Sequence, residues 1–268
     1  MNHKILQEKV RIEGTLIFDT AFRIGSGREG ELGTELGILR DIEGRPILPG
    51  SSLKGCFRSW CERLAPHFGL HACLLDRELS GQDCVGDETY RRQVFQEFKG
   101  LSSEASKVAW LEDKTCHVCR LFGSNLQSSR IFFSDGSLQT WVGTTQVRDG
   151  VCIDRDSETA RPRLKYDFEV VPPGAEYTIV IELENPEEHE LALVASVMAE
   201  WQAGVRLGGF TSRGLGRAHI ANLKVFHLDY GNSAQLQDYL LNRNMPQADT
   251  LLTECLERQL QPGGGRHA

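Results

Sequence analysis

The sequence predicts an α+β fold, a ferredoxin-like (RRM-like) palm with the element order βαββαβ. Two stretches alternate apolar and polar residues, as strands with one buried face do. Two others carry apolar residues every three or four positions, as on one face of a helix. Two further apolar stretches supply the remaining strands and complete a split βαβ arrangement. In chain order these stretches are 10–18, 53–64, 130–135, 177–183, 191–205 and 220–228.

The first strand and the first helix carry the clearest signals. Apolar residues alternate with polar ones over 10–18, and a short hairpin over 38–48 then leads to the helix. A Pro-Gly pair precedes this helix, where Ser51 and Ser52 are expected to cap the first free N–H groups. The apolar face over 53–64 advances by four, three and four residues, which is typical of a half-buried helix.

The second half of the chain again runs from strand to helix to strand. Acidic residues directly follow Pro186, which favours a helix N-terminus there, and the apolar stripe extends over 191–205. A glycine-rich loop, 208–217, separates this helix from the last strand. Amphipathic patterns near the C-terminus predict a helical extension over 233–268.

Two segments lack the period of either a strand or a helix, and we interpret them as insertions. Residues 66–127 are polar and rich in cysteine, whereas residues 140–172 are polar and charged. A loop as long as the second segment is usually functional or disordered. We therefore expect a single domain over 1–268 that carries two insertions and the C-terminal extension.

The composition is that of a globular protein, with 40% hydrophobic and 25% charged residues. No run of about 18 apolar residues occurs, so no membrane association is expected. The N-terminus lacks the apolar core of a signal peptide, which predicts a cytoplasmic location. The net charge of −7 argues against a protein coated in nucleic acid. Residues 204–219 nevertheless hold three arginines and no acid, which is compatible with a local basic groove.

Four cysteines in the first insertion predict a structural zinc site. Cys116 and Cys119 form a close C-x-x-C pair, and Cys73 and Cys84 lie upstream in the same segment. Four thiolates can hold Zn²⁺ tetrahedrally and so stabilise a segment without its own core. The alternative is that some of these cysteines are simply buried. Substitute ligands would be the nearby histidines His67, His71 and His117.

The start of the first helix is a candidate site for anionic oxygens, most naturally those of phosphate. Lys54 and Arg58 lie one turn apart near the positive end of the helix dipole, beside Ser51 and Ser52. The alternative is an ordinary capped surface helix. The second candidate is the loop over 208–217, where glycines alternate with arginines in a way that suits a phosphodiester chain.

That loop is not a dinucleotide-binding fingerprint, because it runs from a helix into a strand and not from a strand into a helix. The sequence therefore argues against a nicotinamide or flavin cofactor. The alternative to phosphodiester binding is that its glycines form a flexible turn. Several acids, Glu35 among them, lie in the loop before the first helix. They could transfer protons or bind a metal beside a phosphate, but ordinary solvated surface acids are the simpler explanation.

In combination these motifs resemble the RAMP superfamily of CRISPR proteins, in particular the repeating backbone subunit of type III effector complexes. The similarity follows the order of that family over roughly 25–217 of this chain. It includes the loop and helix start, a zinc-bearing insertion, a thumb hairpin and a late glycine-rich loop. The segments that carry it are 34–41, 44–55, 116–123, 147–155, 166–170 and 208–216.

The resemblance implies a guide-RNA-binding role. Such subunits stack along a guide RNA (crRNA) on their palms, while their thumbs press between guide and complementary target RNA. The partners expected are therefore guide RNA, target RNA and other CRISPR effector subunits. The insertion over 66–127 would bear the zinc, and 140–172 would form the thumb. The expected RNA-binding residues are Arg28, Arg40, Ser51, Ser52, Lys54, Arg58, Arg148, Arg155, Arg213 and Arg217.

The resemblance also raises the question of target-RNA cleavage. Slicing members use an Asp in the loop before the hairpin, together with Mg²⁺ or Mn²⁺, for attack of a ribose 2′-OH on the adjacent phosphate. The matching residue here is Glu35. Its extra methylene moves the carboxylate by roughly 1 Å or more, and a displacement of this size can lower the rate on the order of 100-fold. Whether this chain is an endoribonuclease is thus left open.

Two other hypotheses remain. The first is a guide-processing endoribonuclease of the same superfamily, which usually needs a histidine base. Only His3 lies near the first strand in the sequence, and this argues against such a site. The second is a non-catalytic scaffold protein that is stabilised by zinc and has no RNA role.

Overall fold

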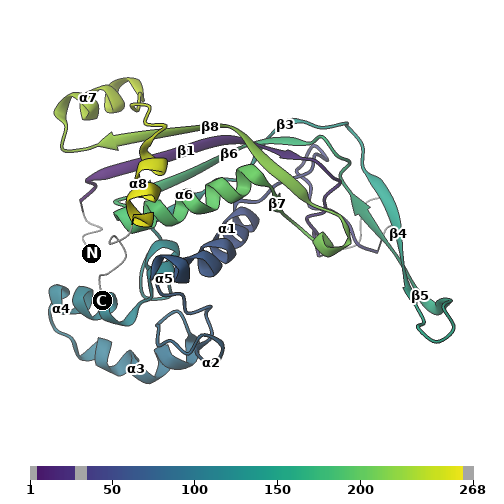
Figure 1. Cartoon of the computed structure of the whole chain (residues 1–268), viewed down its shortest axis with the longest axis horizontal. Helices are drawn as coiled ribbons and strands as arrows, with labels where there is room; N and C mark the ends of the chain where they lie inside the picture. Colours follow the sequence, from purple (N-terminus) through teal and green to yellow (C-terminus); the bar gives the residue numbers. More distant parts are fainter. Residues whose placement is uncertain (1–4, 28–34, 262–268) are drawn as a thin grey trace.

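The computed structural model describes residues 5–27 and 35–261 and shows an α+β protein, as predicted (Figure 1). Its main sheet is antiparallel, with the strand order β2-β6-β1-β8-β7, and β3 also pairs with β6. The strands of this sheet are β1 (Glu8–Phe18), β2 (Ile131–Phe133), β3 (Ser137–Thr140), β6 (Glu176–Glu184), β7 (Val205–Arg206) and β8 (Arg217–Asp229).

β1 is the central strand of this sheet and shows the predicted alternation. Val10, Ile12, Leu16 and Phe18 are all buried, while Arg11, Glu13, Thr15 and Ile17 are partly exposed. β6 shows the same alternation over its whole length. Because β1 pairs with β6 on one side and β8 on the other, the apolar faces of these strands join into one surface.

Two long helices cover that surface, α1 (Gly50–Leu64) and α6 (Glu188–Ala203) (Figure 1). α6 is buried on more than the predicted stripe, because it also contacts α1 and the C-terminal α8 (Leu251–Leu260). Our prediction that its stripe continues to Val205 is wrong. The helix ends before Gly204, and Val205 lies in the short strand β7.

The predicted serine cap of α1 is also wrong, because neither Ser51 nor Ser52 caps the helix. Pro49 stands at the N-cap, and the backbone N–H of Gly50 donates to Oδ1 of Asp135 at 2.7 Å. A carboxylate from a distant part of the chain therefore occupies the positive end of this helix.

The two predicted insertions have regular structure of their own. Short helices fill the first: η1 (Ala65–Phe68), α2 (Arg77–Ser80), α3 (Glu88–Gly100), α4 (Glu104–Lys114) and α5 (His117–Phe122). The second contains the hairpin of β4 (Gln146–Ile153) and β5 (Ala160–Val170), which projects from the body of the molecule (Figure 1). We call this hairpin the thumb.

The C-terminal region over 233–261 contains two helices. α7 (Ser233–Asn242) lies beside the end of β8, and α8 packs on α6 with Leu252 and Cys255 buried. Within the described residues, none of the helices has both the length and the apolar character that crossing a bilayer requires.

A buried ion pair joins β2 to the start of α6. Arg130, with a side chain only 3% exposed, donates to Oε1 of Glu190 at 2.6 Å and to Oε1 of Glu187 at 3.0 Å. Glu190 is equally buried and its Oε2 accepts the backbone N–H of Glu187, which completes a capping box. Burial raises the pKa of Glu190 to about 7, against the opposing effect of Arg130.

Replacing Arg130 with Met should destabilise the protein strongly, because it leaves the Glu190 carboxylate buried without a cation. We expect a loss of about 3–5 kcal/mol in the free energy of unfolding, measured by denaturant titration well above pH 7, because Arg130 lowers the pKa of Glu190 and its loss lets this acid take up a proton near neutral pH. In Arg130→Met/Glu190→Gln the stranded charge is gone while the capping oxygen remains, so part of the stability should return. Equal destabilisation of the single and double variants would contradict this account.

Candidate functional site

The four cysteines predicted as metal ligands form one buried cluster. The sulfur atoms of Cys73, Cys84, Cys116 and Cys119 all lie within 4.8 Å of one another. A tetrahedral zinc site with Zn–S bonds of about 2.3 Å places its sulfurs about 3.8 Å apart. The cluster therefore has the ligand number and approximate size that a zinc ion, or a similar thiophilic metal, requires.

The surroundings of the sulfurs suit thiolates. Backbone N–H groups of Gly86 and Cys116 both donate to Sγ of Cys84 at 3.3 Å. The guanidinium of Arg58 donates to Sγ of Cys119 at 3.1 Å. A side chain at Gly86 would approach that same sulfur to 2.6 Å, so only glycine fits beside the cluster. These donors offset negative charge on sulfur, which four metal-bound thiolates would carry.

Without a cation the four sulfurs cannot all be ionised. Hydrogen bonding with Cys116 lowers the pKa of Cys84 and raises the pKa values of Cys73 and Cys119. The histidines predicted as substitute ligands are not part of the described cluster, which consists of cysteines alone. The Nδ1 atom of His117 instead accepts the backbone N–H of His71 at 3.0 Å.

At the base of the thumb, the loop that precedes the first helix meets β5. Leu36 forms a parallel bridge with Phe168, and the N–H of Glu169 donates to the carbonyl of Leu36 at 3.0 Å. The N–H of Glu35 donates to Oδ1 of Asp167 at 2.7 Å. Glu35 is itself exposed. Its carboxylate is therefore carried at the surface, next to the thumb and beside a second acid.

A buried carboxylate fixes this contact. Glu169 is fully buried and accepts hydrogen bonds from Thr145, from Arg40 and from the backbone N–H of Ile38. Burial would raise the pKa of Glu169, but these donors together hold it below its ordinary value. Arg40, predicted as an RNA contact, thus has its guanidinium in a largely buried ion pair.

The late glycine-rich loop reaches the same place. Phe210 packs edge-on against Phe168, and Arg213 donates to the hydroxyl of Tyr166 while lying over the Phe210 ring. Gly216 has a φ of +74°, and a side chain there would approach the carbonyl oxygen of Leu207 to 2.0 Å. Close approach of the chain to itself therefore explains this glycine without any ligand.

The structure places the predicted RNA-binding residues in different environments. Arg58 is mostly buried and pairs with Glu62 and Cys119, so its charge faces the cysteine cluster. Lys54 is partly buried and donates to Ser129 at 3.1 Å. Arg28 lies outside the described residues, as does most of the loop before Glu35. The exposed members are Ser51, Arg148, Arg155, Arg213 and Arg217, and Ser52 is partly exposed.

The structure also shows polar groups that the sequence did not single out. Because β8 pairs with β1, two of its histidines lie near the first strand in space. His219 contacts Asp19 at 3.0 Å, and His227 contacts Glu8 at 2.9 Å. His3 lies outside the described residues, but our argument that the first strand lacks a suitable histidine is wrong, because β8 supplies two. Pairing between strands that are distant in sequence brings these side chains together, and no local sequence pattern predicts that contact.

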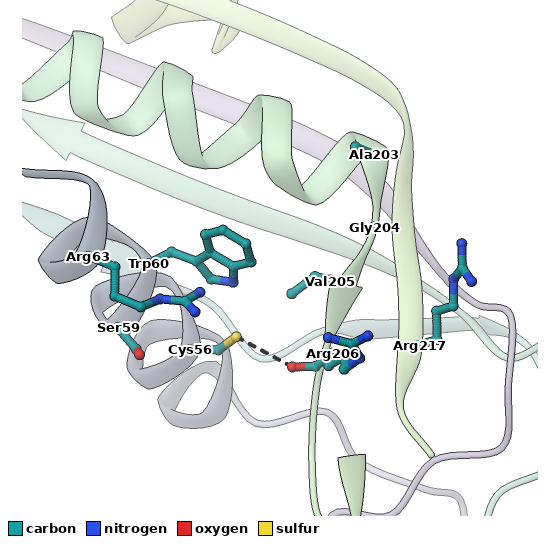
Figure 2. Close-up of a pocket in the computed structure, with 9 residues that line it drawn as sticks. All are labelled: Cys56, Ser59, Trp60, Arg63, Ala203, Gly204, Val205, Arg206 and Arg217. Carbon is teal, nitrogen blue, oxygen red and sulfur yellow. Dashed lines mark hydrogen bonds between the residues drawn. The ribbon is translucent and has the colours of Figure 1, made fainter. Parts of the chain in front are cut away.

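Basic and aromatic side chains line a pocket between α1 and β7, which Figure 2 shows. Trp60 and Arg63 come from α1, Arg206 comes from β7, and Arg217 starts β8. Only Arg217 was predicted to bind RNA. Trp60 was assigned to the buried face of its helix because of its spacing, and it is in fact partly exposed.

Comparison with known proteins identifies the family. The pattern of the RAMP superfamily matches residues 15–219 of this 268-residue chain. The chain belongs to the RAMP superfamily. The matched range runs from the last part of β1 to the start of β8 and includes the cysteine cluster and the thumb.

Two relatives of this RAMP protein are both described as "CRISPR system Cms endoribonuclease Csm3". The one from Methanothermobacter thermautotrophicus is 24% identical over 230 residues, which cover 82% of this chain and 86% of the relative. The one from Methanocaldococcus jannaschii is 40% identical over 65 residues, which cover 24% of this chain and 26% of the relative.

Removing one cysteine of the cluster should abolish metal binding. We expect purified wild-type protein to carry about one zinc per chain and Cys84→Ser to carry little, as measured by elemental mass spectrometry. Cys84→Ser should also be cut faster by protease within the insertion, because metal binding contributes to its folding. Cys152→Ser is the matched control, since Cys152 is exposed on the thumb. Equal zinc content in the two variants would refute the assignment.

Proposed function

We propose that this chain is a backbone subunit of a type III CRISPR effector complex, which binds guide RNA and positions target RNA. Membership of the RAMP superfamily and the two Csm3 relatives support this assignment. The observation that carries it is the meeting of three segments at the base of the thumb. The loop at Glu35, strand β5 and the glycine-rich loop pack together there although they are distant in sequence.

The palm in this proposal is ferredoxin-like. The order β2-β6-β1-β8, with α1 after β1 and α6 after β6, supports that description. The whole chain would form one RAMP domain. Residues 66–127 would be its zinc-bearing insertion, 140–172 its thumb, and 233–268 its C-terminal extension.

Guide RNA would lie along the palm and against the thumb, where cations are exposed. Arg148 is on β4, Arg155 is near the tip of the thumb, and Arg213 is in the glycine-rich loop. Lys54 and Ser51 offer weaker contacts, because Asp135 already occupies the adjacent helix end. Other effector subunits would flank the chain along the RNA.

Cleavage of target RNA is the chemical part of the proposal. Glu35 would assist attack of a ribose 2′-OH on the adjacent phosphate, which forms a cyclic phosphate and releases the 5′-oxygen of the next nucleotide. Mg²⁺ or Mn²⁺ would neutralise the developing charge. Support comes from the exposure of Glu35 and from its position beside Asp167 at the thumb base, where a target strand would be held.

A guide-processing endoribonuclease is the second candidate, and the pair of His219 and Asp19 favours it. A histidine held by a carboxylate can act as a general base, and Arg217 lies beside the same Asp19 at 4.0 Å. Incubating the purified chain with repeat RNA separates the candidates, because a processing enzyme cuts without sister subunits. The remaining hypothesis, a zinc-stabilised scaffold protein without an RNA role, predicts that no RNA co-purifies with the chain.

Removing exposed cations of the thumb and the glycine-rich loop should weaken RNA binding. We expect Arg148→Ala/Arg155→Ala/Arg213→Ala to lower affinity for single-stranded RNA roughly 10-fold or more. The slope of log affinity against log salt concentration should flatten by about 0.7 for each phosphate that the variant no longer neutralises. Anisotropy titrations of the full chain over a range of salt measure both. Arg92→Ala/Lys99→Ala on the exposed side of α3 is the control. An unchanged affinity and slope in the triple variant would exclude this RNA path.

Glu35→Ala should abolish target-RNA cleavage in the assembled complex while leaving RNA affinity unchanged. The expected loss is about 100-fold or more, since a carboxylate in acid–base or metal catalysis contributes at least that much. Glu35→Asp should keep activity. The measurement is a time course of cleavage of labelled target RNA with Mg²⁺ or Mn²⁺. Full activity of Glu35→Ala would show that Glu35 is not the essential carboxylate.

A further inference from the structure

The pocket between α1 and β7 has a volume of about 530 Å³, within the range of small-ligand sites. It lies at the end of the sheet where the glycine-rich loop enters β8 (Figures 1 and 2). Its walls come from the second half of α1 on one side and from 203–206 on the other. A hydrogen bond from Sγ of Cys56 to the carbonyl of Arg206, 3.8 Å long, ties these walls together.

The charge of this pocket is entirely positive. Arg63, Arg206 and Arg217 line it, and none of its lining residues is acidic. Within the described part of the chain, no carboxylate forms an ion pair with Arg63 or Arg206, and Arg217 has only Asp19 at 4.0 Å. Three arginines therefore line one space with almost no compensating charge from the protein. Such an arrangement is suited to an anion with several oxygens, such as a phosphodiester.

The aromatic side chain in the pocket further restricts the class of ligand that it could bind. The guanidinium carbon of Arg63 lies 4.1 Å from the centre of the Trp60 ring, so the cation is held over the indole. In Figure 2 both side chains extend from α1 towards the strand that carries Val205 and Arg206. Stacking on Arg or Trp planes is a common way to hold the unstacked bases of single-stranded RNA. An acidic peptide would use the charges but not this flat surface.

We propose that this pocket binds one unstacked nucleotide of a single-stranded RNA, with its base against Arg63 and Trp60 and its phosphates on Arg206 and Arg217. The inference rests on the proposed RNA-binding function and extends it to a second location on the chain. Because Arg217 ends the glycine-rich loop, an RNA strand that leaves the base of the thumb along this loop reaches the pocket.

The test compares the full-length Arg63→Ala/Arg206→Ala variant with Arg92→Ala/Lys99→Ala, which removes the same charge at exposed positions of α3. We expect affinity for a single-stranded oligoribonucleotide to fall roughly 10- to 100-fold only in the pocket variant. The slope of log affinity against log salt should flatten by about 0.7, because Arg206 is the phosphate-binding arginine that this variant removes. RNA bearing 5-iodouracil should photocrosslink to the peptide that contains Trp60 and not to Trp110 in the insertion.

A charge-conserving variant keeps the test informative if the alanine variant folds poorly. Arg63→Lys/Arg206→Lys should keep the salt slope but lose the Trp60 crosslink, because lysine offers no plane for a base to stack on. Unchanged RNA affinity in the alanine variant together with no crosslink at Trp60 would overturn the pocket assignment and leave RNA binding intact. Failure of wild-type protein to bind RNA would overturn both proposals. Self-association that the alanine variant abolishes, at constant RNA affinity, would instead identify an acidic segment of a second copy as the occupant.

Discussion

The arrangement at the base of the thumb depends on one buried carboxylate, that of Glu169. A charged group removed from water is costly unless hydrogen bonds and opposite charge replace its hydration. Glu169 obtains them from Arg40, from Thr145 and from the backbone of Ile38. These donors come from the loop before α1 and from the connection between β3 and β4. The need to satisfy a single charge thus fixes the position of the first loop relative to the thumb, and with it the position of Glu35.

The glycine-rich loop is held there by a different kind of contact. Phe210 adopts a left-handed backbone conformation with a φ of +59°, which is uncommon for a bulky residue. This conformation lets its ring pack against Phe168 and lie within cation–π distance of Arg23 and Arg213, and these contacts offset the cost of the backbone conformation. Local backbone strain is retained where surrounding contacts over-determine it, and such places are often functional. The loop that carries Arg213 is consequently a fixed part of the thumb base.

Much of this architecture could be predicted because its signals are local. Alternation identified β1 and β6, and the clustering of cysteines in one unpatterned segment identified four side chains that meet in space. The features missed are contacts between distant segments. Asp135 replaces the serine cap of α1, and β8 brings His219 to Asp19 beside the end of β1. Likewise Arg206 and Trp60 share a pocket only because β7 and α1 form its opposite walls. A pattern within a short stretch of sequence cannot predict contacts between such distant segments.

Arg58 lies in a helix that the sequence predicts, but its guanidinium is directed towards the cysteine cluster. Its place near the start of α1 suggested a phosphate ligand, yet its guanidinium lies 3.1 Å from the sulfur of Cys119. Zn²⁺ with four thiolates has a net charge of −2, so a cation at this distance would stabilise the loaded site. The four cysteines also belong to the same hydrophobic core as β1, α1 and α6. A metal bound there would therefore stabilise the first helix of the palm as well as the insertion. In the proposed function this helix also carries Trp60 and Arg63 of the RNA pocket, so bound metal would stabilise the element that forms one wall of that pocket.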